Sequence, residues 1–409
     1  MTDFDIDAVR AEFPALGVAD AGRPRVYFDA PGGTQACRRA IEGMTRHLEI
    51  GTANSGGAFA TSIATDAMSE AAHAAMADLL GGAAEEIAFG PNMTSLTFAV
   101  SRALGRRFAA GDEIVVTRLD HDANVAPWLL LARDLGLTVR WLDFAPDSGT
   151  LRLDDLPALL NARTRLVAVG AASNALGTVT DIAAVGATVR SCCDALVYVD
   201  AVQSVPHLVT DVKAMGCDLL ACSPYKFFGP HQGVLWARAA LLEELEAYKV
   251  RPSSSHPAAV RFETGTPSYE GQAGTHGAVD HLAWLGERAG GSRRDRLVAG
   301  MTALADYERG LGTRFLAGIA GLAKVKLFGP PGIEGRVPTF SFTVDGHRAD
   351  AVAERLAARN IFAWSGNFYA QEAVTRLGLD DAGGLLRVGF CHYSTAAEVD
   401  LLLEALGDL

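Results

Sequence analysis

The segment from residue 197 to residue 236 constrains this chain more than any other, because two apolar stretches in it each lead to a reactive polar side chain. Residues 196–199 (LVYV) end at Asp200, and residues 218–221 (DLLA) end shortly before Lys226. Short continuous apolar runs are typical of buried parallel strands. The carboxyl ends of such strands meet at one sheet edge, where open α/β sheets bind ligands. The sequence therefore predicts an α/β fold with Asp200 and Lys226 at that edge.

A lysine beside a fixed carboxylate suits the cofactor pyridoxal 5'-phosphate (PLP). The cofactor is carried as a Schiff base on a lysine amine, and an acidic partner keeps its ring nitrogen protonated so that the ring accepts electrons. We therefore expect Lys226 to carry PLP and Asp200 to pair with the ring nitrogen.

Residues 221–230 (ACSPYKFFGP) and several further motifs resemble the class V aminotransferase group, and within it the cysteine desulfurases and their desulfurase-like relatives. The resemblance can be followed from about Val26 to Ser394. It implies a PLP-dependent transferase fold (fold type I), with a large α/β domain built on a mainly parallel seven-stranded sheet and a smaller α+β domain. We expect the large domain to comprise residues 20–292, and the small domain to comprise residues 1–19 and 293–409.

A turn of small residues, 90–95 (GPNMTS), precedes an apolar helical pattern that starts at Leu96. Such a turn presents free backbone N–H groups and the positive end of the helix dipole, which together bind phosphate. The resemblance includes Met93 and Thr94, which we expect to hold the cofactor phosphate.

The resemblance implies five further cofactor contacts. His121, in a segment similar to a Glu-His-x-Ala-Asn motif, would lie flat on the PLP ring and shuttle protons. Asn174, in an Asn-x-x-Gly motif, would donate to the phenolic oxygen with support from Gln203. Ser223 and Tyr225 would hold the phosphate, and Tyr225 replaces a histidine that is usual in these enzymes.

The resemblance also implies an amino-acid substrate and a homodimer. Arg387 matches an arginine whose planar fork binds the substrate carboxylate. Thr266, in the motif Phe-Glu-x-Gly-Thr-Pro, would reach the phosphate of the other subunit's cofactor. The 251–259 loop is expected to touch the substrate, and so are three further residues: Asn54, Trp364 and Asn367.

The chain departs from the cysteine desulfurases in residues 362–370 (FAWSGNFYA). Those enzymes carry in this loop a cysteine whose thiolate takes sulfur from the substrate, and the aligned position is Tyr369. A phenol cannot accept sulfur as a thiolate does. Cys391 lies four residues past Arg387, but it follows a buried strand and is interpreted as a packing thiol.

We expect the Lys226 amine to remove the Cα proton of a bound amino acid, because burial lowers the pKa of a lysine. Elimination of a sulfur group at the β or γ carbon is our first hypothesis, with Tyr369 as the proton donor to the leaving group. Transamination and epimerisation remain open. A non-catalytic scaffold is the rival hypothesis, although a scaffold would not require the framework residues Lys226, Asp200, His121, Asn174 and Gln203 together.

The net charge of −12 argues against nucleic acid and anionic membranes as partners. The six cysteines show neither metal-ligand spacing nor a disulfide framework, so no metal site is expected. The first residues are acidic where a targeting segment would be basic, and we expect a cytoplasmic protein.

Overall fold

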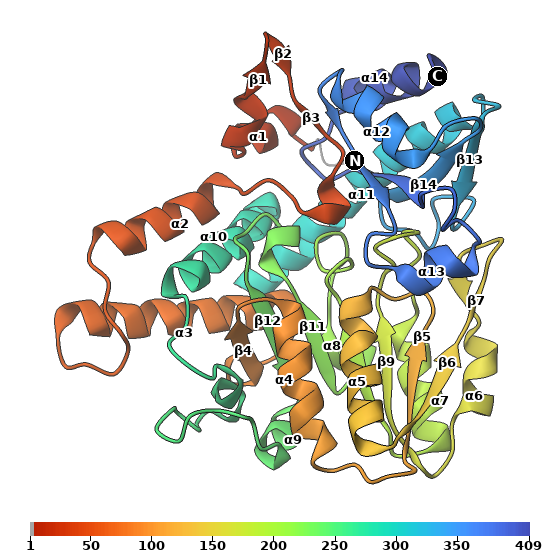
Figure 1. Cartoon of the computed structure of the whole chain (residues 1–409). Helices are drawn as coiled ribbons and strands as arrows, with labels where there is room; N and C mark the ends of the chain where they lie inside the picture. The colour runs from red at the N-terminus through yellow and green to blue at the C-terminus, as the bar shows by residue number, and fades with distance from the viewer. Residues whose placement is uncertain (1–3) are drawn as a thin grey trace.

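The computed structural model describes residues 4–409 and is built around a seven-stranded sheet (Figure 1). The strand β12 runs antiparallel to both of its neighbours, and the other neighbouring strands of this sheet are parallel. This confirms the predicted α/β fold with a mainly parallel sheet. In spatial order the strands are β4 (Ile87–Gly90), β12 (Gly233–Ala237), β11 (Leu219–Cys222), β10 (Leu196–Asp200), β9 (Thr164–Gly170), β5 (Glu113–Thr117) and β6 (Thr138–Leu142).

Both faces of this sheet are covered by helices, which explains why its strands are apolar at nearly every position. Along β10, Val197 and Val199 belong to one hydrophobic core and Tyr198 to the other. The first face packs against α3 (Ala60–Leu80), α7 (Ile182–Cys192), α10 (Tyr269–Leu285) and the first half of α11 (Arg293–Ile319). The second face packs against α4 (Met93–Gly105), α5 (Ala126–Leu135) and α9 (Ala239–Glu244).

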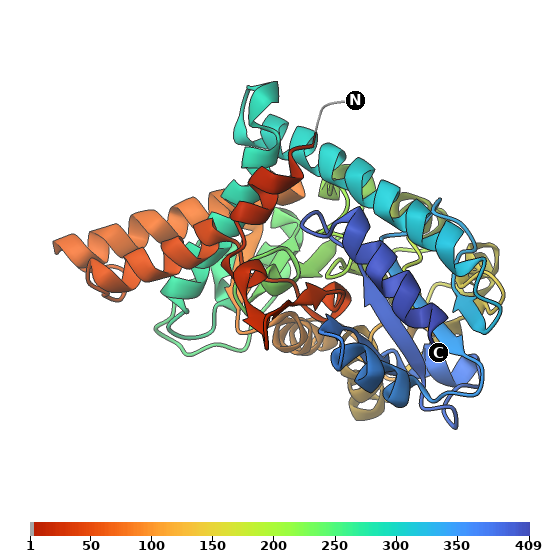
Figure 2. The ribbon, with the colours of Figure 1, turned by 90° about the horizontal axis from the view of Figure 1, so that it is seen from above.

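A smaller unit contains an antiparallel sheet with its own core (Figure 2). Its strands, in spatial order, are β13 (Val325–Phe328), β14 (Thr339–Val344), β17 (Leu385–Gly389) and β16 (Trp364–Gly366). The helices α12 (Ala349–Ala357) and α14 (Ala396–Gly407) pack on this core together with the second half of α11. The long helix α11 thus joins the two units, because Met301 lies in the large core and Phe315 in the small one.

The N-terminal segment contacts the small unit. The short strand β3 (Val26–Tyr27) pairs in parallel with β15 (Ile361–Phe362), and Phe28 belongs to the small core. Val26 also belongs to the small core, whereas Tyr27 belongs to the core of the large unit, so this segment contacts both units. The division of the chain at residues 20 and 293 stays a prediction.

The remaining elements are short or lie at the periphery. They are α1 (Ile6–Ala11), α2 (Arg38–Glu49), α6 (Leu156–Leu159), α8 (Val212–Met215), α13 (Gln371–Arg376), the pair β1 (Ala19–Asp20) and β2 (Arg23–Pro24), and the pair β7 (Phe144–Ala145) and β8 (Thr150–Leu151). In both views, α2 and α3 extend away from the body of the molecule (Figures 1 and 2). Across residues 4–409, no helix combines the length and apolarity that crossing a membrane requires.

Candidate active site

A cavity lies at the carboxyl ends of the parallel strands, as expected for a sheet of this type. It is formed by the segments that follow β4, β5, β9, β10 and β11, and we call it the Lys226 cavity. Its polar lining comprises Asn92, Thr94, Asp120, His121, Asn174, Asp200, Gln203, Ser223, Tyr225 and Lys226, with Met93 beside them. Every cofactor contact expected from the sequence is therefore brought together here, except Thr266.

Lys226 and Asp200 are both buried in this cavity, at 7% and 8% exposure. The Lys226 amine donates a hydrogen bond to the carbonyl of Pro31. Burial lowers the pKa of Lys226 to about 7, and the charge of Arg387 acts in the same direction. Burial raises the pKa of Asp200 to about 6, although one of its oxygens accepts from the Val202 N–H at 2.9 Å. A large part of the Lys226 amine is consequently neutral near pH 7.

His121 presents a neutral imidazole to the cavity. Its Nδ1 accepts from the backbone N–H of Ala123 at 3.0 Å, so this nitrogen carries a lone pair. Burial lowers the pKa of His121 to about 4, assisted by the charges of Lys226 and Arg387. The ring proton is therefore on Nε2, and the phenol ring of Tyr369 lies 5.5 Å away, centroid to centroid.

The end of the cavity that suits a phosphate is the first turn of α4. This helix begins at Met93, one turn earlier than the sequence indicated, because Asn92 caps it by accepting from the Ser95 N–H at 2.8 Å. First-turn N–H groups have no intrahelical partner and point out of the helix. Ser223 is buried nearby and makes no capping hydrogen bond. Tyr225 also lines the cavity and stacks on His231, with ring centroids 4.8 Å apart.

Two amide oxygens indicate that the cavity is built for a polar ligand. Within residues 4–409, Oδ1 of Asn174 and Oε1 of Gln203 are buried without hydrogen-bond partners. Their nitrogens donate to the carbonyl of Phe368 at 2.8 Å and to Oγ1 of Thr339 at 3.1 Å, and each retains a second hydrogen. Orphaned buried polar atoms are costly and rare. Together with Lys226, Asp200 and the start of α4, these amides fit PLP.

Arg387 lies in β17 beside this cavity and is 4% exposed. Its Nη1 donates to the backbone carbonyl of Asn174 at 2.9 Å, whereas its Nε has no partner among the described residues. Its guanidinium carbon lies 4.1 Å from the ring centroid of Phe368. Burial lowers the pKa of Arg387 to about 9. A buried, partly unsatisfied guanidinium is suited to bind a carboxylate.

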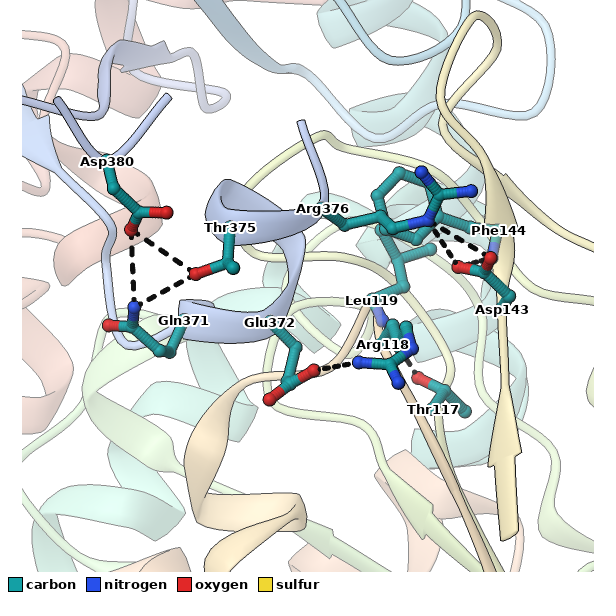
Figure 3. Close-up of polar contacts among 10 residues, drawn as sticks. All are labelled: Thr117, Arg118, Leu119, Asp143, Phe144, Gln371, Glu372, Thr375, Arg376 and Asp380. Atoms are coloured by element: carbon teal, nitrogen blue, oxygen red, sulfur yellow. Dashed lines mark hydrogen bonds and ion pairs between the residues drawn. The ribbon is translucent and has the colours of Figure 1, made fainter. Parts of the chain in front are cut away.

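Residues 367–370 form a loop over the Lys226 cavity, which we call the 367–370 loop. It leads into α13. Tyr369 is 73% exposed, and its backbone carbonyl accepts from the Asp122 N–H at 2.6 Å. Figure 3 shows how α13 is held: Arg118 pairs with Glu372, and Arg376 pairs with Asp143 at 3.1 Å. The large unit therefore holds the loop through the Tyr369 carbonyl and through α13, which follows it.

The other residues proposed from the sequence lie outside the Lys226 cavity, and their roles stay predictions. Thr266 and Asn54 are exposed and line one surface hollow together with residues of the 251–259 loop. Trp364 is 53% exposed and lines a different hollow with Tyr225. The amide of Asn367 is hydrogen-bonded within its own loop, to Gln371 at 2.6 Å and to the Tyr369 N–H at 3.1 Å.

Two carboxylates near the site were missed from the sequence, the buried Asp120 and the half-buried Asp29. Asp120 lines the cavity, accepts from the Gly170 N–H at 3.0 Å, and has its pKa raised to about 7, chiefly by burial. Asp29 lies in electrostatic reach of Arg387 and Lys226, and burial raises its pKa to about 6. Asp120 could have been noticed as a carboxylate at the end of an apolar strand, like Asp200. Asp29 gives a similar signal, because it directly follows the apolar residues Val26 to Phe28, but its approach to Arg387 and Lys226 could be known only from the folded chain.

No cysteine of residues 4–409 lines the Lys226 cavity. Cys391 is fully buried, and burial raises its pKa well above that of an ordinary thiol. Cys192 is exposed and Cys193 half-buried, but both lie at the end of α7, which leads away from the cavity edge of the sheet.

Comparisons with known proteins identify the family of this chain. The model of the family described as "Aminotransferase class-V" matches residues 26–402. The chain belongs to the class V aminotransferase family. Members of this family are PLP-dependent enzymes, so this chain is a PLP-dependent enzyme and its cofactor is PLP.

Relatives of this family member include an uncharacterized protein of Mycobacterium tuberculosis, which is 32% identical over 99% of both chains. A cysteine desulfurase of Serratia proteamaculans is 30% identical over 98% of both. Among solved structures, the apo cysteine desulfurase of Thermococcus onnurineus has a TM-score of 0.87 at 27% identity, covering 98% of this chain and 97% of that one. A cysteine desulfurase of Escherichia coli has a TM-score of 0.84 at 26% identity, covering 99% and 98%.

Proposed function

We propose that this enzyme eliminates a sulfur group from the β or γ carbon of an α-amino acid, without forming a persulfide on a loop cysteine. The observation that carries the proposal is a neutral lysine amine in a cavity that no cysteine of the described residues lines, with the buried, partly unsatisfied Arg387 beside the cavity and the exposed phenol of Tyr369 on the loop over it. Lysine, arginine and phenol supply a base, a carboxylate anchor and a proton donor. The cysteine desulfurase relatives support a sulfur-containing substrate.

The residues that would hold PLP are those of the Lys226 cavity. The start of α4 and Ser223 suit the phosphate, Asp200 suits the ring nitrogen, and the second amide hydrogens of Asn174 and Gln203 suit the phenolic oxygen. When bound, PLP supplies an electron sink that makes the Cα proton of an amino acid removable.

The side chains then divide the proton transfers. Lys226, whose pKa of about 7 keeps much of its amine neutral, removes the Cα proton. His121 offers Nε2–H to the cavity, and its flat imidazole would restrain the cofactor ring. Tyr369, whose ring lies near that of His121, donates a proton to the departing sulfur.

A product analysis tests this reaction. Holoenzyme is incubated with cysteine, cystine, cysteine conjugates and cysteine sulfoxides, without an amino acceptor, and the keto acid, ammonia and released sulfur compound are quantified. We expect sustained formation of keto acid and ammonia in equal amounts, which alkylation of the exposed cysteines does not prevent. Turnover that stops when the cofactor pool is aminated would establish transamination, and loss of optical activity without ammonia would establish epimerisation. Sulfide release that alkylation abolishes would contradict the proposal.

We also propose that the enzyme works as a homodimer in which Thr266 of one chain completes the phosphate site of the other. In support, Thr266 lies outside the Lys226 cavity of its own chain. Large apolar side chains are exposed on α2, α3 and the segment between them, a pattern that marks interaction sites; they are Ile41, Leu48, Ile50, Phe59 and Ile63.

Complementation tests the shared site. A Lys226→Ala chain is mixed with a Thr266→Ala chain under conditions that allow subunit exchange. We expect the mixture to be more active than either variant alone, because one site of each mixed dimer contains both native residues. A mixture no more active than the Thr266→Ala chain, although mass measurement shows mixed dimers, would contradict the shared site.

A further inference from the structure

We propose that Phe368 is a positioning residue of the substrate-carboxylate site, whose ring holds the Arg387 guanidinium so that its unoccupied edge meets the carboxylate. The proposal rests on the proposed function in one respect, namely that the substrate is an α-amino acid. It does not depend on what happens to the substrate after binding.

The guanidinium of Arg387 has one occupied corner and one free edge. Nη1 is occupied by the backbone carbonyl of Asn174, at 2.9 Å. Nε is buried and has no partner among the described residues. A carboxylate prefers two parallel N–H donors of one guanidinium, and the edge formed by Nε and Nη2 offers such a pair. The unsatisfied Nε therefore marks the position at which a carboxylate would be bound.

The ring of Phe368 lies over the guanidinium, with the charged carbon 4.1 Å from the ring centroid. A cation at this distance is attracted to the ring, and more strongly where water is excluded, as it is around a residue that is 4% exposed. A ring on one face leaves the in-plane N–H groups free. Phe368 can therefore fix the plane of the arginine without competing with a carboxylate for its donors.

The backbone of the 367–370 loop holds Phe368 in this position. Phe368 and Tyr369 adopt the left-handed region, with φ of +55° and +57°. Bulky residues rarely adopt this conformation, and it persists only where surrounding contacts impose it. Here the carbonyl of Phe368 accepts from Nδ2 of Asn174 at 2.8 Å, and that of Tyr369 accepts from the Asp122 N–H at 2.6 Å.

Asn174 therefore connects the parts of the site. Its backbone carbonyl fixes Nη1 of Arg387, its side chain fixes the carbonyl of Phe368, and its own turn lines the cofactor cavity. The ion pairs of α13 fasten the chain just beyond the loop (Figure 3). The hydrogen bonds of Asn174 thus hold Arg387 and the Lys226 cavity in fixed positions relative to each other.

A binding comparison tests the role of Phe368. The affinity of holoenzyme is measured by calorimetry for 2-aminoisobutyrate, which has no Cα hydrogen to lose, and for isopropylamine, which lacks the carboxylate. The ratio of the two affinities reports what the carboxylate contributes. We expect Phe368→Leu to lower this ratio by about tenfold, and Phe368→Tyr to preserve it. The matched control is Phe108→Leu, a similar truncation of a half-buried side chain that packs on the core of the large unit, which should leave the ratio unchanged.

Two results would overturn the proposal. One is an unchanged ratio in Phe368→Leu, and the other is an equal loss of both ligands, which would indicate a general structural role. Should Phe368→Leu fail to fold, Phe368→Met provides the same comparison. Because 2-aminoisobutyrate cannot react by loss of a Cα proton, a holoenzyme that shows the expected ratios but eliminates nothing would refute the proposed reaction and not the role of Phe368.

Discussion

Lys226 can act as a base because burial lowers its pKa. The lowered pKa also brings the titration of the amine into a pH range in which it can be measured. Its pKa falls from the ordinary 10.5 to about 7, since the charged amine loses hydration and lies near Arg387. The Asp200 carboxylate opposes this shift without cancelling it. The pKa of Lys226 is thus set by burial and by Arg387, Asp200 and Asp29, which come from three segments far apart in the sequence.

The first prediction concerns loading of the apo-protein with PLP. Only the neutral amine can attack the cofactor aldehyde, so the loading rate should rise as the pH increases through about 7 and level off above it. Stopped-flow absorbance at constant cofactor concentration measures the rate. An unburied lysine would give a rate that continues to rise toward pH 10, which would contradict the low pKa. In Lys226→Ala, borohydride should fix no cofactor to the chain.

A second prediction concerns Tyr369. Removing its hydroxyl in Tyr369→Phe should lower kcat for elimination by about 100-fold, the usual scale of a lost proton donor, with little change in KM. The loss of kcat should be smaller for substrates whose leaving group is a weakly basic thiolate, because such a group needs no proton. Steady-state kinetics over a leaving-group series provides the measurement. A deficit that is the same for all leaving groups would assign Tyr369 a positioning role instead.

At the residue scale, the sequence predicted the types and spacing of the cavity residues but not their hydrogen bonds. Asp200, Asn174 and Lys226 follow apolar strands, and parallel strands must bring their ends together. That Asn174 uses its amide on Phe368, or that Asp29 approaches Arg387, depends on contacts between segments far apart in the chain. No local pattern encodes such contacts.

At the scale of elements, the site depends on loops and helix ends that are held by specific partners. The cap of α4 by Asn92 starts the turn expected to bind phosphate at Met93, with only Pro91 and Asn92 between it and the end of β4 at Gly90. The helix α13 carries the 367–370 loop and is attached through Arg118–Glu372 and Arg376–Asp143 (Figure 3). Each ion pair is partly exposed, so each is worth only about 0.2–1 kcal/mol.

The third prediction follows from that modest value. Glu372→Gln should weaken the attachment of α13 and raise KM for an amino acid severalfold, while changing the free energy of unfolding by less than about 1 kcal/mol. The control is Glu404→Gln, which removes a more exposed carboxylate of α14 from an arginine, Arg359, that is as exposed as Arg118. Kinetics and urea unfolding of both variants provide the comparison. A KM that changes equally in both would rule out a specific role for α13.

Apolar strands such as β10 and β11 were predictable, because their side chains are buried on both faces of the sheet. The short strand β16 gives no such signal, and it exists because β17 offers it hydrogen-bond partners. The pairing of β3 with β15 likewise could be known only from the folded chain.

At the scale of the whole molecule, the two units meet over the site, and α11 and the N-terminal segment tie them together. Arg10 of α1 donates to the carbonyl of Tyr393 at 2.6 Å and pairs with Glu398 at 3.0 Å. The large unit supplies the Lys226 cavity, and the small unit supplies Arg387 and the 367–370 loop. A change in the angle between the units would therefore separate the carboxylate anchor from the base.

The overall fold was predictable because the family resemblance spans nearly the whole chain and its motifs lie at strand ends. The reaction was not, because the residues that differ from the cysteine desulfurases are those nearest the substrate side chain. The resemblance places Tyr369 at the position of a nucleophilic cysteine, and the ring of Phe368 lies over Arg387. Neither residue specifies by its type alone which bond would break after the Cα proton has left.

The most direct test of the central claim is exchange of the Cα hydrogen in deuterated water, followed by NMR for a panel of amino acids that perturb the absorption of the bound cofactor. The common step of elimination, transamination and epimerisation is removal of that hydrogen by Lys226. We predict deuterium at Cα, or products derived from its loss, with the wild-type holoenzyme and none with cofactor-reconstituted Lys226→Ala. Equal exchange by both proteins, or no exchange by the wild type with any amino acid that binds, would contradict the account.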